Sequence, residues 1–440
     1  MPIRKTVSFF LACIVVAALV QQAFPRSSPQ VLDIGSERQL LVDRYLIAES
    51  AGLQLKLHSP LPREVMLPME KPWKKEASCC SVILEDEGKF RLWYRVASRV
   101  AAPGEWWNYT AYAESTDGVH WTRPQLNLYD YQGSKKNNLV WMGPGGNMSV
   151  LKDRRPEVPE EERYKAVMRT GPGALGLVSP DGLRWKLIQQ DPILTGGKFD
   201  SHNVIFQDPW TLQFRYYGRG FVKPPSGRTS DLRHGIRRIR TASSADFREW
   251  TPLGFVEMPQ APLDHLYTNA TTPYQLSRGL YLMFPKRFVP ERTFGPSWGD
   301  QGQSDIVFAS SRDGLHWDRT FLEAFLRPGL DRRNWHERAV IMGQGIVQTG
   351  KHELSMYYFE NLKTSSCRIR RGTVRLDGFV SVHAPYQKGY FVTPPLVFQG
   401  RHFWINYSTS AVGFVRVEIQ DEGGQAIHGF EELVCVRKTW

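Results

Sequence analysis

The stretch ESTDGVHW, residues 114–121, combines a tight turn with a large aromatic residue. Asp and Gly both suit a turn, Gly because it adopts positive φ and Asp because its side chain can bond its own backbone. The Trp that follows can pack on a neighbouring sheet and bury a large apolar area. Residues 109–113, just before the turn, are strand-like. The stretch therefore predicts the corner of a β-hairpin.

Four related turns follow at nearly constant spacing. Two keep the Asp-Gly-x-x-Trp pattern, one has Phe in place of Gly, and the last lacks the Trp; their aspartates are Asp181, Asp313, Asp246 and Asp377, respectively. Counted from Asp117, successive spacings are 64, 65, 67 and 64 residues. Chance does not keep such a spacing along a whole chain, so the pattern indicates a repeated structural unit.

Each unit also contains an earlier hairpin. The segments are SVILEDEGKFRLWYRV (81–96), SVLKD with RYKAVMR (149–169), NVIFQDPWTLQFRYYGR (203–219), TTPYQLSRGLYLMFPKR (271–287) and GIVQTGKHELSMYYFEN (345–361). Four antiparallel strands repeated radially form a β-propeller blade. The predicted fold is therefore all-β, a five-bladed β-propeller of four-stranded antiparallel blades. A sandwich would not need a repeat of this length.

The ends of the chain leave this pattern. We predict a lead-in strand region over 31–70, the propeller over 71–385 and an accessory β segment over 386–440. The last segment holds too few strands for an independent sandwich, so it is interpreted as a partial, β-sandwich-like segment. The apolar stretch RQLLVDRYLIAES (38–50) is a candidate to complete the last blade.

The N-terminus is typical of a targeting segment. Arg4 and Lys5 precede an apolar run over 7–20, and Gln21-Gln22-Ala23 follows. This order predicts a signal peptide over 1–25 and an exported protein, periplasmic or extracellular. An uncleaved N-terminal anchor is the alternative, and no later stretch is apolar enough to span a membrane.

The net charge of +12 raises the question of an acidic partner. Basic residues cluster at 71–75, at RHGIRRIR (233–240) and at CRIRR (367–371). A solvated basic surface is the plainer interpretation, and an anionic glycan, such as a sulfated one, is the alternative. Nucleic acid is not expected, because no recognition-helix pattern is present. The five cysteines include no C-x-x-C, and no histidines have metal-ligand spacing, so neither a metal nor another cofactor is predicted.

The sequence resembles a family of exported, planctomycete-type five-bladed propellers related in fold to glycoside hydrolase families 32 and 43. The resemblance covers residues 38 to about 430 and is carried by YAESTDGVHWTRP (112–124), FDSHNVIFQDP (199–209), HLYTNATTPY (265–274), SSRDGLHWDR (310–319), AFLRPGLDRRNWHER (324–338), GIVQTGKHELSMYY (345–358), RLDGFVSV (375–382) and TSAVGFVRVEIQDEGGQAIHGF (409–430). It implies the fold, and it implies chemistry only by analogy.

The chain departs from the family pattern at two places. The family usually has Pro-Trp-Glu at the entrance of its first blade, where this chain has Pro72-Trp73-Lys74, with a carboxylate only at Glu76. The family's C-terminal sandwich normally continues, whereas this sequence stops at Trp440. The first departure weakens one candidate active-site carboxylate, and the second concerns a truncated accessory segment.

In a propeller, polar residues just before the inner strands face a funnel at one end of the axis. The catalytic candidates there are Asp200, Asp264 and Glu337, which come from three units. The candidates for substrate binding at the same entrances are Trp73, Glu76, His202, Asn203, His265, Asn269, Trp335 and Arg338.

Cleavage of a glycosidic bond needs two carboxyl groups, one as a proton donor and one as a nucleophile or base. By analogy with the fold, Glu337 is assigned as the acid, Asp200 as the nucleophile or base, and Asp264 as a group that tunes a pKa or binds a hydroxyl. Each also has a structural alternative: Asp200 as a turn cap, Asp264 as a backbone acceptor and Glu337 as a salt-bridge partner.

The sequence therefore predicts a glycoside hydrolase-like protein acting on a poly- or oligosaccharide. A non-catalytic carbohydrate-binding propeller is the main alternative, and a protein-interaction scaffold is the third.

Overall fold

The computed structural model describes residues 31–69, 80–98, 107–225, 235–292, 302–335, 340–362 and 364–434. Within these segments the protein is all-β, as predicted, and helix is limited to two 3-10 turns, Glu160–Glu162 and Arg332–Asn334. None of the helices in these segments is long and apolar enough to cross a membrane. The predicted signal peptide lies outside the described residues.

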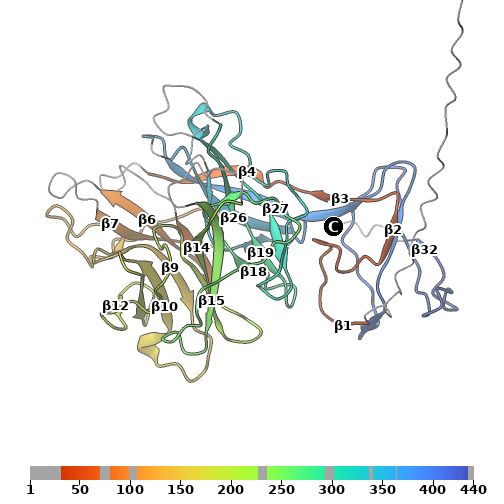
Figure 1. Ribbon diagram of the computed structural model, residues 1–440, viewed down its shortest axis with the longest axis horizontal. Helices are drawn as coiled ribbons and strands as arrows, with labels where there is room; N and C mark the ends of the chain where they lie inside the picture. The colour runs from red at the N-terminus through yellow and green to blue at the C-terminus, as the bar shows by residue number, and fades with distance from the viewer. Residues whose placement is uncertain are drawn as a thin grey trace, which may run out of the picture.

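Three four-stranded antiparallel sheets follow one another along the chain (Figure 1). In each sheet every strand pairs with the next one in sequence, as the hairpins predicted. The strands are β5 (Ser81–Asp86), β6 (Lys89–Ser98), β7 (Trp107–Ser115) and β8 (Leu139–Trp141); β9 (Gly146–Lys152), β10 (Tyr164–Arg169), β11 (Ala174–Ser179) and β12 (Lys186–Leu187); and β13 (Val204–Gln207), β14 (Phe214–Val222), β15 (Ile236–Ser244) and β16 (Gly254–Phe255).

The fourth unit contains two sheets. Its four-stranded sheet has the order β18, β19, β22, β23. A three-stranded sheet has the order β17, β20, β21, in which β17 precedes the other sheet in sequence and β20 and β21 lie between β19 and β22. The bounds are β17 (His265–Leu266), β18 (Thr272–Pro273), β19 (Tyr281–Met283), β20 (Lys286–Val289), β21 (Gln303–Ile306), β22 (Ala309–Ser311) and β23 (Trp317–Asp318).

The last sheet combines both ends of the chain. It contains β24 (Ile341–Met342), β25 (Val347–Gly350), β26 (Glu353–Glu360) and β27 (Arg368–Arg375), and β27 pairs with β4 (Leu61–Pro68). The outer strand is β4, whereas the stretch 38–50, the candidate to complete this blade, contacts the same unit through Arg38, which pairs with Asp377. Leu40 and Val42 bury their side chains in the apolar core beside Phe379. Residues 38–50 thus contribute apolar side chains to the core, while β4 forms the backbone hydrogen bonds with β27.

Short two-stranded sheets join the remaining N-terminal residues to the C-terminal segment. Figure 1 shows them beside the larger group of sheets. The pairs are β3 (Gln54–Leu57) with β28 (Val380–His383), β2 (Glu49–Ala51) with β29 (Tyr390–Val392), β1 (Leu32–Gly35) with β30 (Leu396–Phe398), and β31 (Arg416–Val417) with β32 (Leu433–Val434).

The Asp-Gly turns have a common hydrogen-bond pattern. In the first, Asp117 Oδ1 accepts the backbone N–H groups of Val119 and His120, both at 2.8 Å, and Trp121 Nε1 donates to the Gly118 carbonyl at 3.0 Å. Gly118 has φ +73°, a left-handed conformation that favours glycine. The turn is therefore a corner in which the Asp orders the backbone and the Trp closes it.

The other turns show how far this pattern extends. Phe247 replaces the glycine of the third turn and still adopts φ +72°, a conformation that is costly for a bulky side chain. In the fifth turn Asp377 itself has φ +60°, and its carboxylate accepts from Arg38 and Tyr274. The fifth turn, which lacks the Trp, therefore also has a different backbone conformation and different partners for its Asp.

The turn glycines also join neighbouring sheets. The carbonyls of Gly182, Gly314 and Gly118 accept hydrogen bonds from Trp93, Tyr217 and Tyr357, respectively, each at 2.7 Å. A Cβ at Gly182 would lie 2.9 Å from the Trp93 ring, so the close approach itself requires glycine. The third of these bonds connects the last sheet to the first.

The first strands of three sheets meet at Gln344. Its amide accepts from Ser149 Oγ at 2.9 Å and donates to the Ile205 carbonyl at 2.7 Å, while its backbone N–H donates to the Ser81 carbonyl at 2.8 Å. Ser149 lies in β9, Ile205 in β13 and Ser81 in β5. The residues that lead into these strands are thereby brought close together.

Candidate functional site

A chain of hydrogen bonds joins the entrances of three first strands. Asn147, at the start of β9, donates to the Ser201 carbonyl at 3.0 Å, and Ser201 Oγ donates to the Tyr267 carbonyl at 2.9 Å. Asn147 has φ +56°, a conformation that Asn adopts more easily than most residues. Ser201 and Tyr267 lie next to or near the predicted candidates Asp200 and His265, and the structure brings them together with Asn147.

His202 lies beside this chain and is fully buried. Among the described residues neither of its ring nitrogens has a hydrogen-bond partner. Burial lowers the pKa of its imidazole to about 4, so the ring is neutral near pH 7. Two side-chain atoms at the other entrances, Asn147 Oδ1 and Thr268 Oγ1, are also buried polar atoms without a hydrogen-bond partner in the described part of the chain.

Asp200 is the exposed acidic residue of the site. Its side chain is 56% exposed and forms an ion pair with Arg219, whose side chain is 5% exposed. Arg219 lies in β14 on the same face as Tyr217, which bonds the next sheet. The buried guanidinium therefore holds the carboxylate at the edge where β13 begins.

Three cationic side chains surround the Tyr267 ring. The cationic groups of Arg219, Arg237 and Lys286 lie 5.0, 4.6 and 5.3 Å from the centre of its ring. Burial, and next the positive charge of Arg237, lower the pKa of Arg219 to about 10, although Tyr267 acts in the opposite sense. We call these four residues the Tyr267 cluster.

Asp264 pairs with an arginine that is not a member of the Tyr267 cluster. It lies just before β17, and its carboxylate pairs with Arg319, whose side chain is 1% exposed. His265, the first residue of β17, packs edge-on against Phe288. The described residues provide no contact between Asp264 and Asp200, so the structure does not join these two catalytic candidates.

The two asparagine candidates form hydrogen bonds within the protein. Asn203 donates to the Phe199 carbonyl at 2.8 Å and accepts from the Tyr216 hydroxyl at 2.8 Å. Asn269 donates to the Tyr217 carbonyl at 3.2 Å and accepts from Thr271. Both are buried, so their amides shape the entrances and do not face a ligand.

The remaining candidates divide into two groups. His265 Nδ1 accepts the Arg237 backbone N–H at 3.3 Å and is buried, while Trp335 is half-buried and donates to the Gly329 carbonyl at 2.8 Å. The others, Trp73, Glu76, Glu337 and Arg338, lie outside the described residues. Their predicted roles stay predictions.

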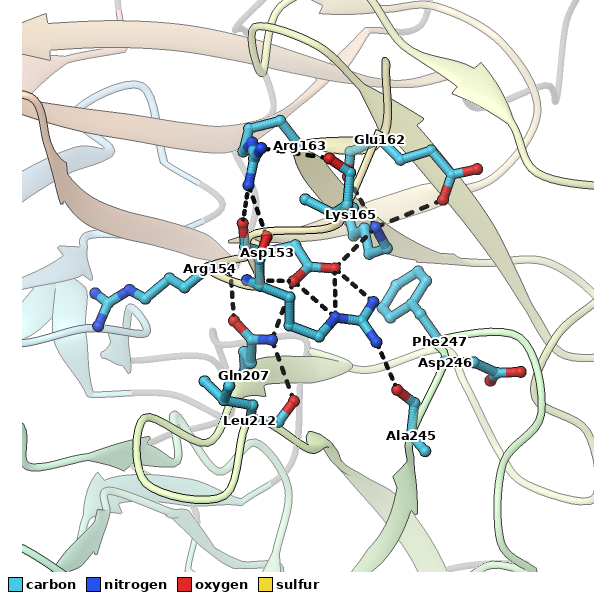
Figure 2. A network of polar contacts seen from close by, with 12 residues as sticks. Asp153, Arg154, Glu162, Arg163, Lys165, Gln207, Leu212, Ala245, Asp246 and Phe247 are labelled. Atoms are coloured by element: carbon cyan, nitrogen blue, oxygen red, sulfur yellow. Dashed lines mark hydrogen bonds and ion pairs between the residues drawn. The ribbon is translucent and has the colours of Figure 1, made fainter. Parts of the chain in front are cut away.

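The opposite ends of β9 and β13 hold a second buried polar network (Figure 2). Asp153, just after β9, contacts Lys165 Nζ at 3.0 Å, Arg155 Nη2 at 2.7 Å and Gln207 Nε2 at 3.1 Å. Gln207 in turn accepts the Arg154 backbone N–H at 2.7 Å. We call Asp153, Arg155, Lys165 and Gln207 the Asp153 network.

The Asp153 network pairs opposite charges out of contact with water. The side chains of Asp153 and Lys165 are both 0% exposed. Burial alone would raise the pKa of Asp153, but hydrogen bonds from Arg155 and Lys165 lower it overall. Burial lowers the pKa of Lys165, and its contacts with Asp153 act in the opposite sense. The partners thus stabilise the Asp153 carboxylate and offset part of the burial of Lys165, which is typical of a structural network.

Arg219 was missed at the level of sequence. It lies inside FRYYGRGFV (214–222), a strand whose pattern indicates burial on both faces. A charged residue in a buried strand needs an oppositely charged or hydrogen-bonding partner. That requirement could have identified Arg219 as a site residue from the sequence. No group of three or more potential metal-ligating side chains occurs among the residues that the structure describes.

A scan against protein-family models finds no match for this chain, and a search of curated proteins finds none either. Solved structures with a similar fold include a glycoside hydrolase, with 14% identity, a TM-score of 0.48, and coverage of 72% of this chain and 92% of its own. A β-1,2-mannobiose phosphorylase from Listeria innocua has 14% identity, a TM-score of 0.46, and coverage of 73% and 97%.

A glycosyl hydrolase from Bacteroides ovatus has 14% identity, a TM-score of 0.44, and coverage of 74% of this chain and 97% of its own. Similarities of this size do not identify the substrate of this chain.

Proposed function

We propose that the chain is an exported, five-bladed glycoside hydrolase-like protein that cleaves a poly- or oligosaccharide at the entrances of its first strands. The observation that carries the proposal is Asp200, a carboxylate that is exposed to solvent yet held by a buried arginine. It lies next in sequence to Ser201, which belongs to the hydrogen-bond chain across three sheets. Such convergence of polar groups is typical of a ligand site.

The ion pair suits Asp200 to one of the two roles in hydrolysis. An opposite charge in contact favours the ionised form of a carboxylate, which cannot donate a proton. Asp200 is therefore assigned as the nucleophile or the base that takes a proton from water. The complementary proton goes to the leaving glycosidic oxygen, and Glu337 is the proposed donor. Overall, one water molecule is added across one C–O bond.

Aromatic side chains support a carbohydrate ligand. Tyr267 is half-buried beside Arg219, the residue that holds Asp200. A partly exposed ring offers an apolar face on which a sugar can stack. Trp73 and Trp335 are proposed to add further stacking surfaces at other entrances.

Hydrolysis is tested on a panel of oligosaccharides with the wild type, Asp200→Asn and Glu337→Gln. Both substitutions remove a carboxylate and keep the side-chain shape, so we expect each to reduce turnover at least about 100-fold. Asp305→Asn is the matched control, because Asp305 in β21 also pairs with an arginine, Arg287 of β20, on the face of that sheet opposite Lys286. Full activity in both site variants would refute the assignment.

A non-catalytic carbohydrate-binding protein is the second candidate. It is favoured by one observation: Asp200 and Asp264, two of the three predicted catalytic carboxylates, are both engaged by buried arginines. If the wild type binds an oligosaccharide but releases no product after prolonged incubation, this second candidate replaces the first.

A further inference from the structure

The C-terminal segment differs from the rest of the protein in the burial of its apolar residues. Within 381–433, all of which the structure describes, no residue is buried. By contrast, Phe284 and Phe308, which pack on each other in the fourth unit, are each 1% exposed. Five aromatic residues of the segment are 48–72% exposed, and we call them the C-terminal patch: Phe398, Phe403, Trp404, Phe414 and Phe430.

Short sheets and two hydrogen bonds fix this segment on the protein. β28, β29 and β30 each pair with one strand from the N-terminal end, and β31 pairs with β32. Asn406 donates to the Leu376 carbonyl at 2.8 Å, and Arg375 donates to the Tyr407 carbonyl at 3.2 Å. A two-stranded sheet is marginally stable in water unless something packs against its hydrophobic face. The segment therefore presents an ordered apolar surface that a partner would stabilise.

The apolar area of the C-terminal patch suits a dimer interface. A covered aromatic side chain buries about 150–250 Å². Five residues that are 48–72% exposed therefore offer on the order of 600 Å² on each copy of the chain. A standard interface buries about 800 Å² on each partner, and about 65% of a homodimer interface is apolar. The patch can thus supply the apolar area that a stable dimer needs.

The distribution of charge favours a second copy at this place. Residues 381–440 contain five basic and five acidic residues, whereas the whole chain has a net charge of +12. Two basic proteins repel each other, so two copies approach most easily through segments that carry no net charge. A strongly acidic or strongly basic partner would gain little attraction there.

We propose that the C-terminal patch packs against the same patch of a second copy of this chain. The contact is isologous, because a two-fold axis brings each patch onto its equivalent and the assembly closes at two chains. Sheets that pack face to face in this way lie about 10 Å apart and exclude water between them. The inference goes beyond the proposed function, since it requires no sugar and assigns no role in cleavage.

Sedimentation velocity of the full chain tests the proposal. At about 10 µM protein we expect a species of twice the mass of one chain, which dissociates on dilution. The dimer should persist at high salt, because salt screens ion pairs but not the burial of apolar area. A species of one-chain mass at every concentration up to about 100 µM would overturn the proposal.

The double variant Phe403→Gln/Trp404→Gln removes two exposed rings from each copy. Aromatic residues dominate the energy of interfaces, so we expect the Kd of the dimer to rise at least about 100-fold. Leu330→Gln is the matched control, because Leu330 is 102% exposed and lies outside the segment; its Kd should change less than about two-fold. Far-UV circular dichroism checks the fold. If the double variant does not fold, Phe430→Gln replaces it, with an expected rise of about ten-fold.

Hydrogen exchange locates the contact. Amides of 386–433 should exchange more slowly at about 10 µM than after dilution below the Kd, whereas those of β5 and β6 should not change with concentration. A dimer that survives the double variant overturns the proposal, as does exchange in 386–433 that is the same at every concentration. Slow exchange in a single chain would mean that residues of the same chain cover the patch. A mass that keeps growing with concentration would mean a heterologous contact that does not close.

Discussion

The two ends of β9 and β13 carry two buried polar clusters of different character. At one end, every polar side-chain atom of Asp153, Lys165 and Gln207 has a partner (Figure 2). At the other end, His202, and one oxygen each of Asn147 and Thr268, have none among the described residues. The two clusters are about 20 Å apart along a strand such as β9.

The difference separates a stabilising region from a functional one. Buried polar atoms are almost always hydrogen-bonded, because an unsatisfied one costs free energy. The Asp153 network meets that requirement within the protein. The entrances meet it only when water or a ligand supplies the missing partners. Substitutions at the first end should therefore change stability alone, and those at the second should change binding more than stability.

The largest expected effect is that of Asp153→Asn. Removing Asp153 breaks the closest ion pair of buried Lys165 and leaves it only the Glu162 carboxylate at 3.6 Å, which costs about 3–5 kcal/mol of unfolding free energy. Denaturant unfolding measures it, and Asp191→Asn, at an exposed position, should cost less than about 0.5 kcal/mol. A loss below about 1 kcal/mol for Asp153→Asn would remove the distinction between the two ends.

The second effect depends on pH and on His202. The pKa of its imidazole is about 4 in the folded protein, against about 6.5 when unfolded. Between these values the unfolded chain binds a proton that the folded chain does not, so stability falls as the pH drops from about 6.5 to 4. The difference of about 2.5 units corresponds to about 3 kcal/mol.

His202→Leu tests this value, because the variant lacks the titrating group. Unfolding measured from pH 7 to pH 4 should show a wild-type loss about 3 kcal/mol greater than that of the variant. If the unfolding free energies of the wild type and of His202→Leu changed equally with pH, the His202 ring would have a hydrogen-bond partner in solution. At pH 7 the variant should fold normally, since replacing an unpartnered polar group by an apolar one is nearly neutral.

Ser201→Ala should have a smaller effect. The substitution removes the hydrogen bond to the Tyr267 carbonyl, worth about 1 kcal/mol of stability. The lost bond also no longer fixes the segment that carries Asp200 relative to Tyr267. Oligosaccharide affinity should therefore fall by more than the free energy of unfolding does. Calorimetry and denaturant unfolding on the same samples compare the two. Equal losses in both would make Ser201 a purely structural residue.

The repeated turns made most of the sheets predictable, because Asp, Gly and Trp specify a local geometry that sequence spacing preserves. The partner of β27 was not predictable in this way. The stretch 38–50 contains the apolar run Leu40 to Val42, yet β4 provides the pairing, from about 300 residues away in sequence. Apolar character predicts burial of Leu40 and Val42, but it does not specify which backbone forms the ladder.

The sequence predicted where the site residues lie along the chain, but not which partners their side chains contact. Asn147, Ser201 and Tyr267 meet because strand entrances at one end of the sheets must lie together. Asp264 pairs with Arg319, 55 residues away in sequence, and such a tertiary contact cannot be read from the local pattern. Polar residues at an entrance can thus be found in a sequence, but their partners cannot.

Glu162→Gln is expected to have the smallest effect and gives the sharpest test of what burial contributes. Glu162 lies at the rim of the Asp153 network with 20% of its side chain exposed. It pairs with the 44% exposed Arg248 at 2.6 Å and contacts the buried Lys165 only at 3.6 Å. Exposed pairs contribute about 0.2–1 kcal/mol, because water solvates both charges once they separate. Gln keeps a hydrogen-bond acceptor for Arg248, and Asp153 still neutralises Lys165 at 3.0 Å. Unfolding of the single and double variants with Asp153→Asn measures the coupling between the two sites. A cost for Glu162→Gln as large as that for Asp153→Asn would show that total charge, and not burial, sets the stability of this end.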